Sequence, residues 1–196
     1  VYIENFRPGV VDRLGVGYEA ARALNPSIVM LSTSLMGSQG PASHLAGFGY
    51  HAGAIAGYYE VTGWPDLPPD GPWLAYTDTV APRFQAAALM AALDHKRCTG
   101  EGQHIELAQL ECGLQFLAPE ILAVEAGGKA PSRLGNRSHN TAPQGVYPCA
   151  GEDQWCAIAV ESDDQWRALR SALGDPEWAR ASTLATNPGR LAAHDA

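Results

Sequence analysis

Three short stretches of this chain carry residues whose types and spacing could do chemistry. The first is Tyr76–Thr79, which places the carboxylate of Asp78 just before an alanine-rich segment that predicts a helix. The positive end of a helix dipole favours the ionised form of a carboxylate, and the ionised form is the one that acts as a nucleophile. An Asp ahead of a helix is also a common cap for the first turn, so both interpretations stay open on the residues alone.

The second stretch is Glu4–Gly9, with Arg13 close behind it. Its pattern indicates the end of a strand, a turn and the start of a helix. Free backbone N–H groups at such a helix start can hold a phosphate, and the guanidinium groups of Arg7 and Arg13 can add positive charge. A plain strand-to-helix turn with two surface arginines fits the same residues.

The third stretch, Leu134–Pro143, mixes small, polar and titratable residues in a long predicted loop. Asn136, Arg137 and His139 are its candidates for contact with a substrate, because a loop of this kind can close over a binding site. A solvated linker would have the same composition. His139 could act as a general base, although a single loop histidine is commonly just exposed.

The elements that must position these residues follow from hydrophobic patterning and chain-breaking residues. Val1–Phe6 and Ser27–Ser34 are strand-like, and short helices between them predict a βαβ unit with a parallel sheet. Arg83–Lys96 predicts a helix with Pro82 at its start. The other expected elements are a strand at 104–108, a helix at 109–125 interrupted at Pro119, a hairpin of 145–149 with 154–160, and a helix capped by Ser162.

Charge and cysteine usage argue against several classes of protein. The formal net charge is −8, which disfavours a nucleic-acid binder because such proteins rely on clustered Lys and Arg. The four cysteines show no C-x-x-C pairing and no spacing that indicates zinc, so we expect reduced thiols, a cytoplasmic setting and no metal. No apolar run is long enough to span a bilayer. The chain opens in a strand-like segment at Val1, so we expect a piece of a longer protein.

Taken together, these stretches resemble the class III CoA-transferase family, which includes formyl-CoA, carnitine and succinyl-CoA:acid CoA-transferases. Matching segments follow one another in the family's order. They are ENFRPG at Glu4–Gly9, LGVGYEAARALNPSIV at Leu14–Val29, GSQGP at Gly37–Pro41, the Asp78 segment, TGEGQHIELA at Thr99–Ala108, and LGN…AP…VYPC at Leu134–Cys149. The resemblance spans nearly the whole chain, and members of the family are considerably longer.

The resemblance implies an α/β fold with a partial Rossmann-like large domain, a parallel sheet flanked by helices, and the start of a smaller α+β domain. The implied boundaries are 1–128 for the large domain, 129–144 for a linker and active-site loop, and 145–196 for the small domain. Members form homodimers of two interlocked rings. The implied partners are therefore a second copy, acyl-CoA and carboxylic acids, with no nucleic acid and no membrane.

The resemblance also assigns roles to residues. It implies that Asp78 is the catalytic aspartate and that coenzyme A or acyl-CoA, bound as a substrate without a metal, lies along Asn5, Phe6, Arg7 and Arg13. The substrate loop would carry Asn136, Arg137 and His139. The implied activity is transfer of coenzyme A between carboxylic acids through aspartyl anhydride and aspartyl-CoA thioester intermediates.

Two alternatives stay open: an α-methylacyl-CoA racemase or epimerase of the same fold, and a non-catalytic acyl-CoA-binding half of a fused protein. Ala46–Tyr50 lacks the His-Asp pair of the related racemases, and His51 is offset from the expected place. The presence of Asp78 counts against the non-catalytic alternative. Asn136–Ala142 replaces the glycine-run loop of the formyl-CoA transferases, and Pro82 replaces a glycine that is usual in the family.

Overall fold

The computed structural model describes residues 1–194, and the chain divides into two compact units, 1–133 and 134–196. The first unit begins with strand β1 (Tyr2–Glu4), helices α1 (Val10–Arg13) and α2 (Tyr18–Leu24), and strand β2 (Val29–Ser34). Strand β3 (Gln103–Ala108) completes a three-stranded sheet in the order β1-β2-β3, and all its pairings are parallel. The predicted βαβ unit and parallel sheet are therefore confirmed.

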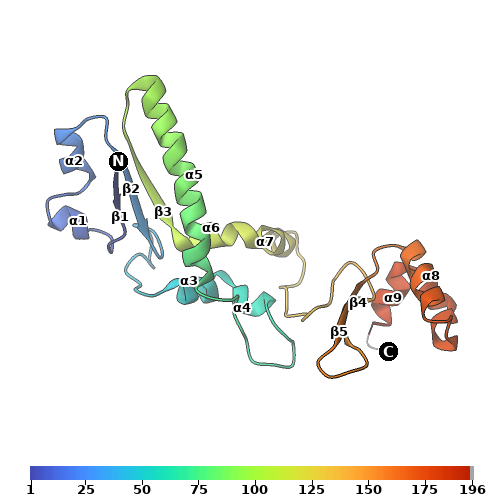
Figure 1. The fold of residues 1–196 in the computed structure, drawn as a ribbon. Coiled ribbons are helices and arrows are strands. Elements are labelled where there is room, and N and C mark those ends of the chain that lie inside the picture. Colours follow the sequence, from blue (N-terminus) through green and yellow to red (C-terminus); the bar gives the residue numbers. More distant parts are fainter. Residues whose placement is uncertain (195–196) are drawn as a thin grey trace. The chain divides into compact units, whose positions relative to one another are not determined.

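The sheet has helices on both faces. Side chains alternate between the faces along each strand, so each face presents its own side chains to a helix. Helices α1 and α2 lie on one face and the long helix α5 (Tyr76–Thr99) crosses the other (Figure 1). On the α5 face, Gln85 donates its side-chain N–H to Thr33 Oγ1 of β2 over 2.8 Å. Val80 and Ala81 of α5 form one buried apolar cluster with Cys112.

Helix α5 begins earlier than the sequence predicts. We expected a helix at 83–96 with Pro82 at its start, but the helix begins at Tyr76 and Pro82 lies inside it. Burial of Thr77, Val80 and Ala81 offsets the cost of an internal proline. Asp78 therefore lies in the first turn of the helix, not ahead of it.

Pro82 has a local consequence for the turn that carries Asp78. A proline has no N–H, so residue 82 cannot donate the i to i−4 hydrogen bond to the carbonyl of Asp78. One residue further on, the guanidinium of Arg83 donates to the carbonyl of Thr79. The first turn of α5 is thus joined to the rest of the helix by one hydrogen bond fewer than a regular helix would have.

The remaining helices of the first unit pack around the start of α5. They are α3 (Gly49–Ala56), α4 (Tyr58–Val61), α6 (Gln109–Leu114), a 3-10 turn at Gln115–Leu117, and α7 (Ala118–Glu125). The helix expected at 109–125 is interrupted, as predicted, although the interruption precedes Pro119. The hydroxyl of Tyr58, which is buried, donates to the carbonyl of Gly113 over 2.7 Å and so joins α4 to α6.

Tyr58→Phe tests this contact through its pH dependence. Burial, with smaller contributions from Tyr76 and Glu120, raises the pKa of Tyr58 from its ordinary 10.0 to about 12. A raised folded-state pKa means that the neutral phenol contributes stability that is fully present below pH 10.0 and is lost as the pH rises through about 12. Over that range, urea melts should show the wild-type free energy of unfolding falling by about 2 kcal/mol more than that of the variant. Equal losses in the two proteins would contradict this assignment.

The second unit is built on a hairpin and a capped helix. Strands β4 (Gln144–Pro148) and β5 (Trp155–Ala159) pair antiparallel, as predicted. Helix α8 (Asp163–Ala172) begins after Ser162, whose side chain accepts the backbone N–H of Gln165. Two 3-10 turns, Glu177–Arg180 and Ser182–Ala185, lead to α9 (Asn187–Ala192).

The core of the second unit contains a charged side chain. Val160, Trp166 and Ala179 form the apolar cluster. Arg190, of which only 3% is exposed, lies with its guanidinium carbon 5.5 Å from the centre of the Trp166 ring. Its Nε donates to the carbonyl of Ala142 over 2.7 Å, and the side chain therefore ties α9 to the start of the hairpin.

Two negative findings bear on the sequence predictions. None of the four cysteines forms a disulfide in the described part of the chain, Cys149 and Cys156 near the hairpin included, and reduced thiols stay a prediction. Within the described part of the chain, no helix combines the length and apolar character that crossing a membrane requires.

Candidate active site

Two adjoining pockets lie where the parallel strands of the first unit end. Ligands of open α/β sheets bind at the carboxyl ends of the strands, so this edge is the first place to look for a site. Phe6, Pro8 and Ser34 line both pockets and form the boundary between them. The pockets have volumes of about 270 Å³ and about 430 Å³.

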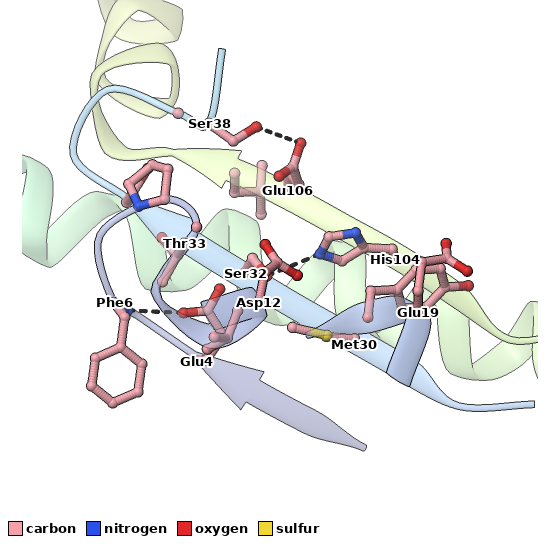
Figure 2. A pocket seen from close by; sticks show the side chains of 17 residues that line it. Glu4, Phe6, Asp12, Glu19, Met30, Ser32, Thr33, Ser38, His104 and Glu106 are labelled. Atoms are coloured by element: carbon pink, nitrogen blue, oxygen red, sulfur yellow. Dashed lines mark hydrogen bonds between the residues drawn. The ribbon is translucent and has the colours of Figure 1, made fainter. Parts of the chain in front are cut away.

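The smaller pocket, called the acidic pocket here, is rich in carboxylates. Its charged and hydrogen-bonding lining includes Glu4, Asp12, Glu19, Glu106, Ser32 and His104 (Figure 2). Several of these groups are already held in place. Ser32 Oγ lies 2.9 Å from His104 Nε2, Ser38 Oγ donates to Glu106 over 2.8 Å, and the N–H of Phe6 donates to Glu4 over 2.9 Å (Figure 2).

Tyr18 and His104 both line the acidic pocket, and their rings stack with centroids 4.7 Å apart. Carboxylates and hydroxyls accept hydrogen bonds, whereas a phosphate placed among four carboxylates would be repelled. The acidic pocket therefore suits hydroxyl or amine groups of a ligand. The sequence analysis did not predict this pocket, whose carboxylates include Glu106 of β3.

The larger pocket, called the Arg7 pocket here, has the opposite character. It is lined by Asn5, Phe6, Arg7, Phe48 and His51, among others, and no Asp or Glu within residues 1–194 lines it. In the same part of the chain, the guanidinium of Arg7 has no ion-pair partner. This pocket brings together three of the four residues that the sequence assigned to the coenzyme site.

The fourth of those residues, Arg13, lines neither pocket. It lies at the end of α1, and its Nη1 is 3.6 Å from the place where a Cβ on Gly9 would stand. Gly9 has φ 77°, a left-handed backbone that glycine adopts without strain. Arg13 thus lies against the turn that connects β1 to α1.

His51 lies at the start of α3 with its ring orientation fixed. The backbone N–H of Phe48, the N-cap residue, donates to His51 Nδ1 over 3.0 Å. Because Nδ1 accepts a hydrogen bond, the proton of the neutral ring resides on Nε2. A histidine three residues after an N-cap is the signal that could have indicated this contact from sequence.

Asp78 lies next to the start of α3. A Cβ built on Gly49 would stand 2.8 Å from the carboxyl carbon of Asp78, so the carboxyl group and the Gly49 backbone are in contact. The neighbouring Thr77 is buried and donates its hydroxyl to the carbonyl of Gly49 over 3.1 Å. The exposed Asp78 is therefore positioned by a buried hydrogen bond one residue away.

The carboxylate of Asp78 is thus close to two helix starts. It lies in the first turn of α5 and against the first residue of α3. The first amides of a helix have no acceptor within the helix, so the N–H groups of Gly49 and Tyr50 are available to a ligand. Partial positive charge at both helix starts favours negative charge at this point.

The three predicted loop residues belong to the second unit. Asn136, Arg137 and His139 lie in a segment without helix or strand, ahead of β4. The end of that segment is fixed by Asn187 of α9, which donates to the carbonyl of Asn140 over 2.6 Å. Contact of these three residues with a substrate stays a prediction.

Comparison with known proteins decides the family. The model for "CoA-transferase family III" matches residues 1–196. The chain belongs to CoA-transferase family III. The resemblance deduced from the sequence segments is therefore confirmed.

Relatives and a solved structure agree with this family. A succinyl-CoA–D-citramalate CoA-transferase of Chloroflexus aurantiacus is 35% identical over 194 residues, which are 99% of this chain and 46% of the relative. A succinate–glutarate CoA-transferase of Agrobacterium fabrum is 35% identical over 192 residues, or 98% of this chain and 48% of the relative. The crystal structure of a CAIB/BAIF family protein from Brucella suis matches with a TM-score of 0.86 and 33% identity, over 98% of this chain and 50% of that one.

The chain thus spans about half the length of the curated relatives it matches. The α/β architecture with its parallel sheet agrees with the family fold. The roles of the individual site residues, the domain boundaries and the interlocked dimer go beyond these comparisons and are treated as proposals.

Proposed function

We propose that this chain supplies the nucleophile and part of the coenzyme site of an enzyme that transfers coenzyme A between carboxylic acids. The observation that carries the proposal is the position of Asp78, whose carboxylate lies in the first turn of α5 and against Gly49 of α3. The names of the relatives support the same activity, since they are CoA-transferases acting on organic acids.

In the proposed cycle, a carboxylate oxygen of Asp78 attacks the thioester carbonyl of an acyl-CoA, and coenzyme A leaves as a thiolate. The thiolate then attacks the aspartyl carbonyl of the resulting anhydride, which releases the first acid as a carboxylate and forms an aspartyl-CoA thioester. The acceptor carboxylate attacks that thioester and gives a second anhydride and free thiolate. Attack of the thiolate on the new acyl group yields the product and restores Asp78.

Each step of this cycle places negative charge on an oxygen beside Asp78. The amides of Gly49 and Tyr50 open α3, whose first residue contacts the carboxyl group of Asp78, and we propose that they stabilise the charge. No proton is consumed or released over the cycle, so the site does not need a general base.

The coenzyme is proposed to lie along the Arg7 pocket. Arg7 would attract its phosphates, with Asn5 and Phe6 on the same wall and Arg13 adding charge beside the turn. By analogy with the family, we also propose that a second copy completes an interlocked homodimer. The loop that carries Asn136, Arg137 and His139 would then close over the substrates.

The racemase alternative is disfavoured by His51. A racemase needs a base on each face of the substrate α-carbon, and His51 is the histidine closest in sequence to the place where the racemases carry one. Its Nδ1 already accepts the N–H of Phe48, which leaves Nε2 as a donor in the neutral ring. His51 is therefore suited to donate a hydrogen bond rather than to remove a proton.

Chemical trapping tests the proposal directly. The full-length protein would be incubated with a panel of acyl-CoAs, treated with hydroxylamine and analysed by peptide mass spectrometry. We expect a hydroxamate at Asp78, because both the anhydride and the aspartyl-CoA thioester react with this nucleophile at the aspartyl carbonyl.

Asp70→Asn is the matched control for this experiment, since Asp70 is also exposed and lies in the connector that precedes α5. The control should leave the adduct at Asp78 unchanged, whereas Asp78→Asn should remove it. Acyl-CoA binding without any adduct at Asp78 would overturn the proposed function, and exchange of the α-proton in deuterated water would then be measured.

A further inference from the structure

The hydroxyl of Thr77 connects two helices that lie far apart in the sequence. Thr77 is fully buried in the first turn of α5, and its Oγ1 donates to the carbonyl of Gly49, the first residue of α3, over 3.1 Å. A buried donor that lost this acceptor would be left unsatisfied, which is costly, so the two helices are held to this contact. The first turns of α3 and α5 therefore keep a fixed position relative to each other.

The methyl group of the same side chain reaches a third helix. A Cβ on Gly113 of α6 would stand only 3.1 Å from Thr77 Cγ2, so glycine leaves the space that this methyl group needs. Gly113 is itself buried, and its carbonyl accepts the hydroxyl of Tyr58 over 2.7 Å. Because protein interiors are close-packed, a larger residue at position 113 would press on Thr77.

These contacts lead to the proposed nucleophile. A Cβ on Gly49 would stand 2.8 Å from the carboxyl carbon of Asp78, so the residue that accepts the Thr77 hydrogen bond also touches the carboxyl group. The side chain of Asp78 is exposed, so burial does not hold it in place. The position of its carboxylate against α3 therefore depends on how the first turn of α5 meets α3.

We propose that Thr77 and Gly113 are positioning residues for Asp78, with Gly113 acting through Thr77 and Thr77 acting through Gly49. This inference rests on the proposed transferase function and adds two residues to it. Both are buried, so their effect is on the orientation of the carboxylate and not on contact with a substrate. The hydroxyl of Thr77 sets the contact with α3, and its methyl group sets the spacing from α6.

Thr77→Val and Thr77→Ser separate these two groups in the full-length enzyme. Thr77→Val keeps the shape of the side chain and loses the hydroxyl, so we expect kcat to fall about 10-fold, the effect of one lost hydrogen bond. KM for the acyl-CoA should not change, because Thr77 does not line the pocket proposed for the coenzyme. Thr77→Ser keeps the hydroxyl and should retain the wild-type kcat, although the cavity left by the methyl group lowers its Tm.

A merely structural role would give a different order of variants. If Thr77 only stabilised the fold, kcat would follow Tm, and Thr77→Ser would lose activity as well. Thr99→Val is the matched control, because Thr99 lies at the other end of α5 and its hydroxyl also donates to a main-chain carbonyl, that of His95, over 2.9 Å. This control should leave kcat unchanged.

Gly113→Ala tests the step from α6 to Thr77. The added methyl group would press on Thr77 Cγ2, so we expect kcat to fall several-fold with KM for the acyl-CoA unchanged. The double variant Gly113→Ala/Thr77→Ser lacks the methyl group that is pressed on and keeps the hydroxyl, so its kcat should return close to that of the wild type. Two unrelated defects would add to each other instead.

The hydroxylamine adduct at Asp78 separates failure of this inference from failure of the proposed function. If the wild type forms the adduct but Thr77→Val keeps the wild-type kcat, or the double variant is slower than Gly113→Ala, the positioning role is wrong and the transferase proposal stands. If the wild type forms no adduct at Asp78, the transferase proposal fails and the positioning role fails with it.

Discussion

Asp78→Asn is expected to lower kcat for acyl transfer by about 10³-fold or more while leaving the fold intact. The amide cannot form an anhydride, so every covalent step of the proposed cycle is lost. The side chain is exposed and has no ion-pair partner within residues 1–194, so its contribution to stability comes mainly from the helix dipole. That contribution is about 0.3–1 kcal/mol for a carboxylate in a first turn.

The structure argues against the helix cap that the sequence left open, because the N-cap of α5 is Ala75 and Asp78 lies within the first turn. A nucleophile predicts a large loss of activity with a small change in the free energy of unfolding. A purely structural role in that turn predicts the reverse, a measurable loss of stability with activity retained. Steady-state kinetics and denaturant melts on the same preparation measure both quantities, and retained turnover would exclude Asp78 as the nucleophile.

Gly49→Ala is expected to have the second largest effect, a fall in kcat of about 10²-fold. The added Cβ would stand 2.8 Å from the carboxyl carbon and Oδ2 of Asp78 and 2.9 Å from the Cβ of Ala75, closer than such atoms approach in proteins. The carboxylate must move, and a displacement of about 1 Å of a reacting group can cost this much in rate.

Gly53→Ala is the matched control for this prediction. Gly53 lies on the same helix, and an added Cβ would meet nothing closer than Tyr59 Cε2 at 3.9 Å, an ordinary contact. Alanine also favours a helix more than glycine does, so this variant should be as stable as the wild type or more so. Equal activities of the two variants would show that contact with Gly49 does not position Asp78.

Much of the scaffold could be predicted because the signals are local. An apolar, β-branched run after Pro26 marks the strand at Val29–Ser34. Ile105 and Leu107 alternate with polar residues in the strand at Gln103–Ala108, and Ser162 marks the start of α8. The start of α5 could not be predicted in this way. Pro82 is an unfavourable residue for a helix interior, and only the burial of Thr77 and Val80 against the rest of the unit explains why the helix includes it.

The candidate site was predictable only in part for a related reason. Arg7 and Asp78 stand in segments with a recognisable order, so their importance could be inferred from the chain alone. The acidic pocket depends on sheet register, which places Ser32 opposite Glu106 although the two are far apart in sequence. The orientation of the His51 ring depends on a hydrogen bond from the backbone N–H of Phe48, and a Cβ on Gly47 would stand 3.0 Å from His51 Cγ.

Pro82 divides α5 into two parts that differ in their main-chain hydrogen bonds. From Arg83 to Thr99 no proline interrupts the helix, whereas the turn before Pro82 lacks the main-chain hydrogen bond to the carbonyl of Asp78. During the proposed cycle Asp78 carries an acyl group, then a much larger thioester, then an acyl group again. One hydrogen bond fewer lowers the cost of tilting that turn, and such tilting would let the nucleophile follow these changes in bulk without shifting the helix that supports the sheet.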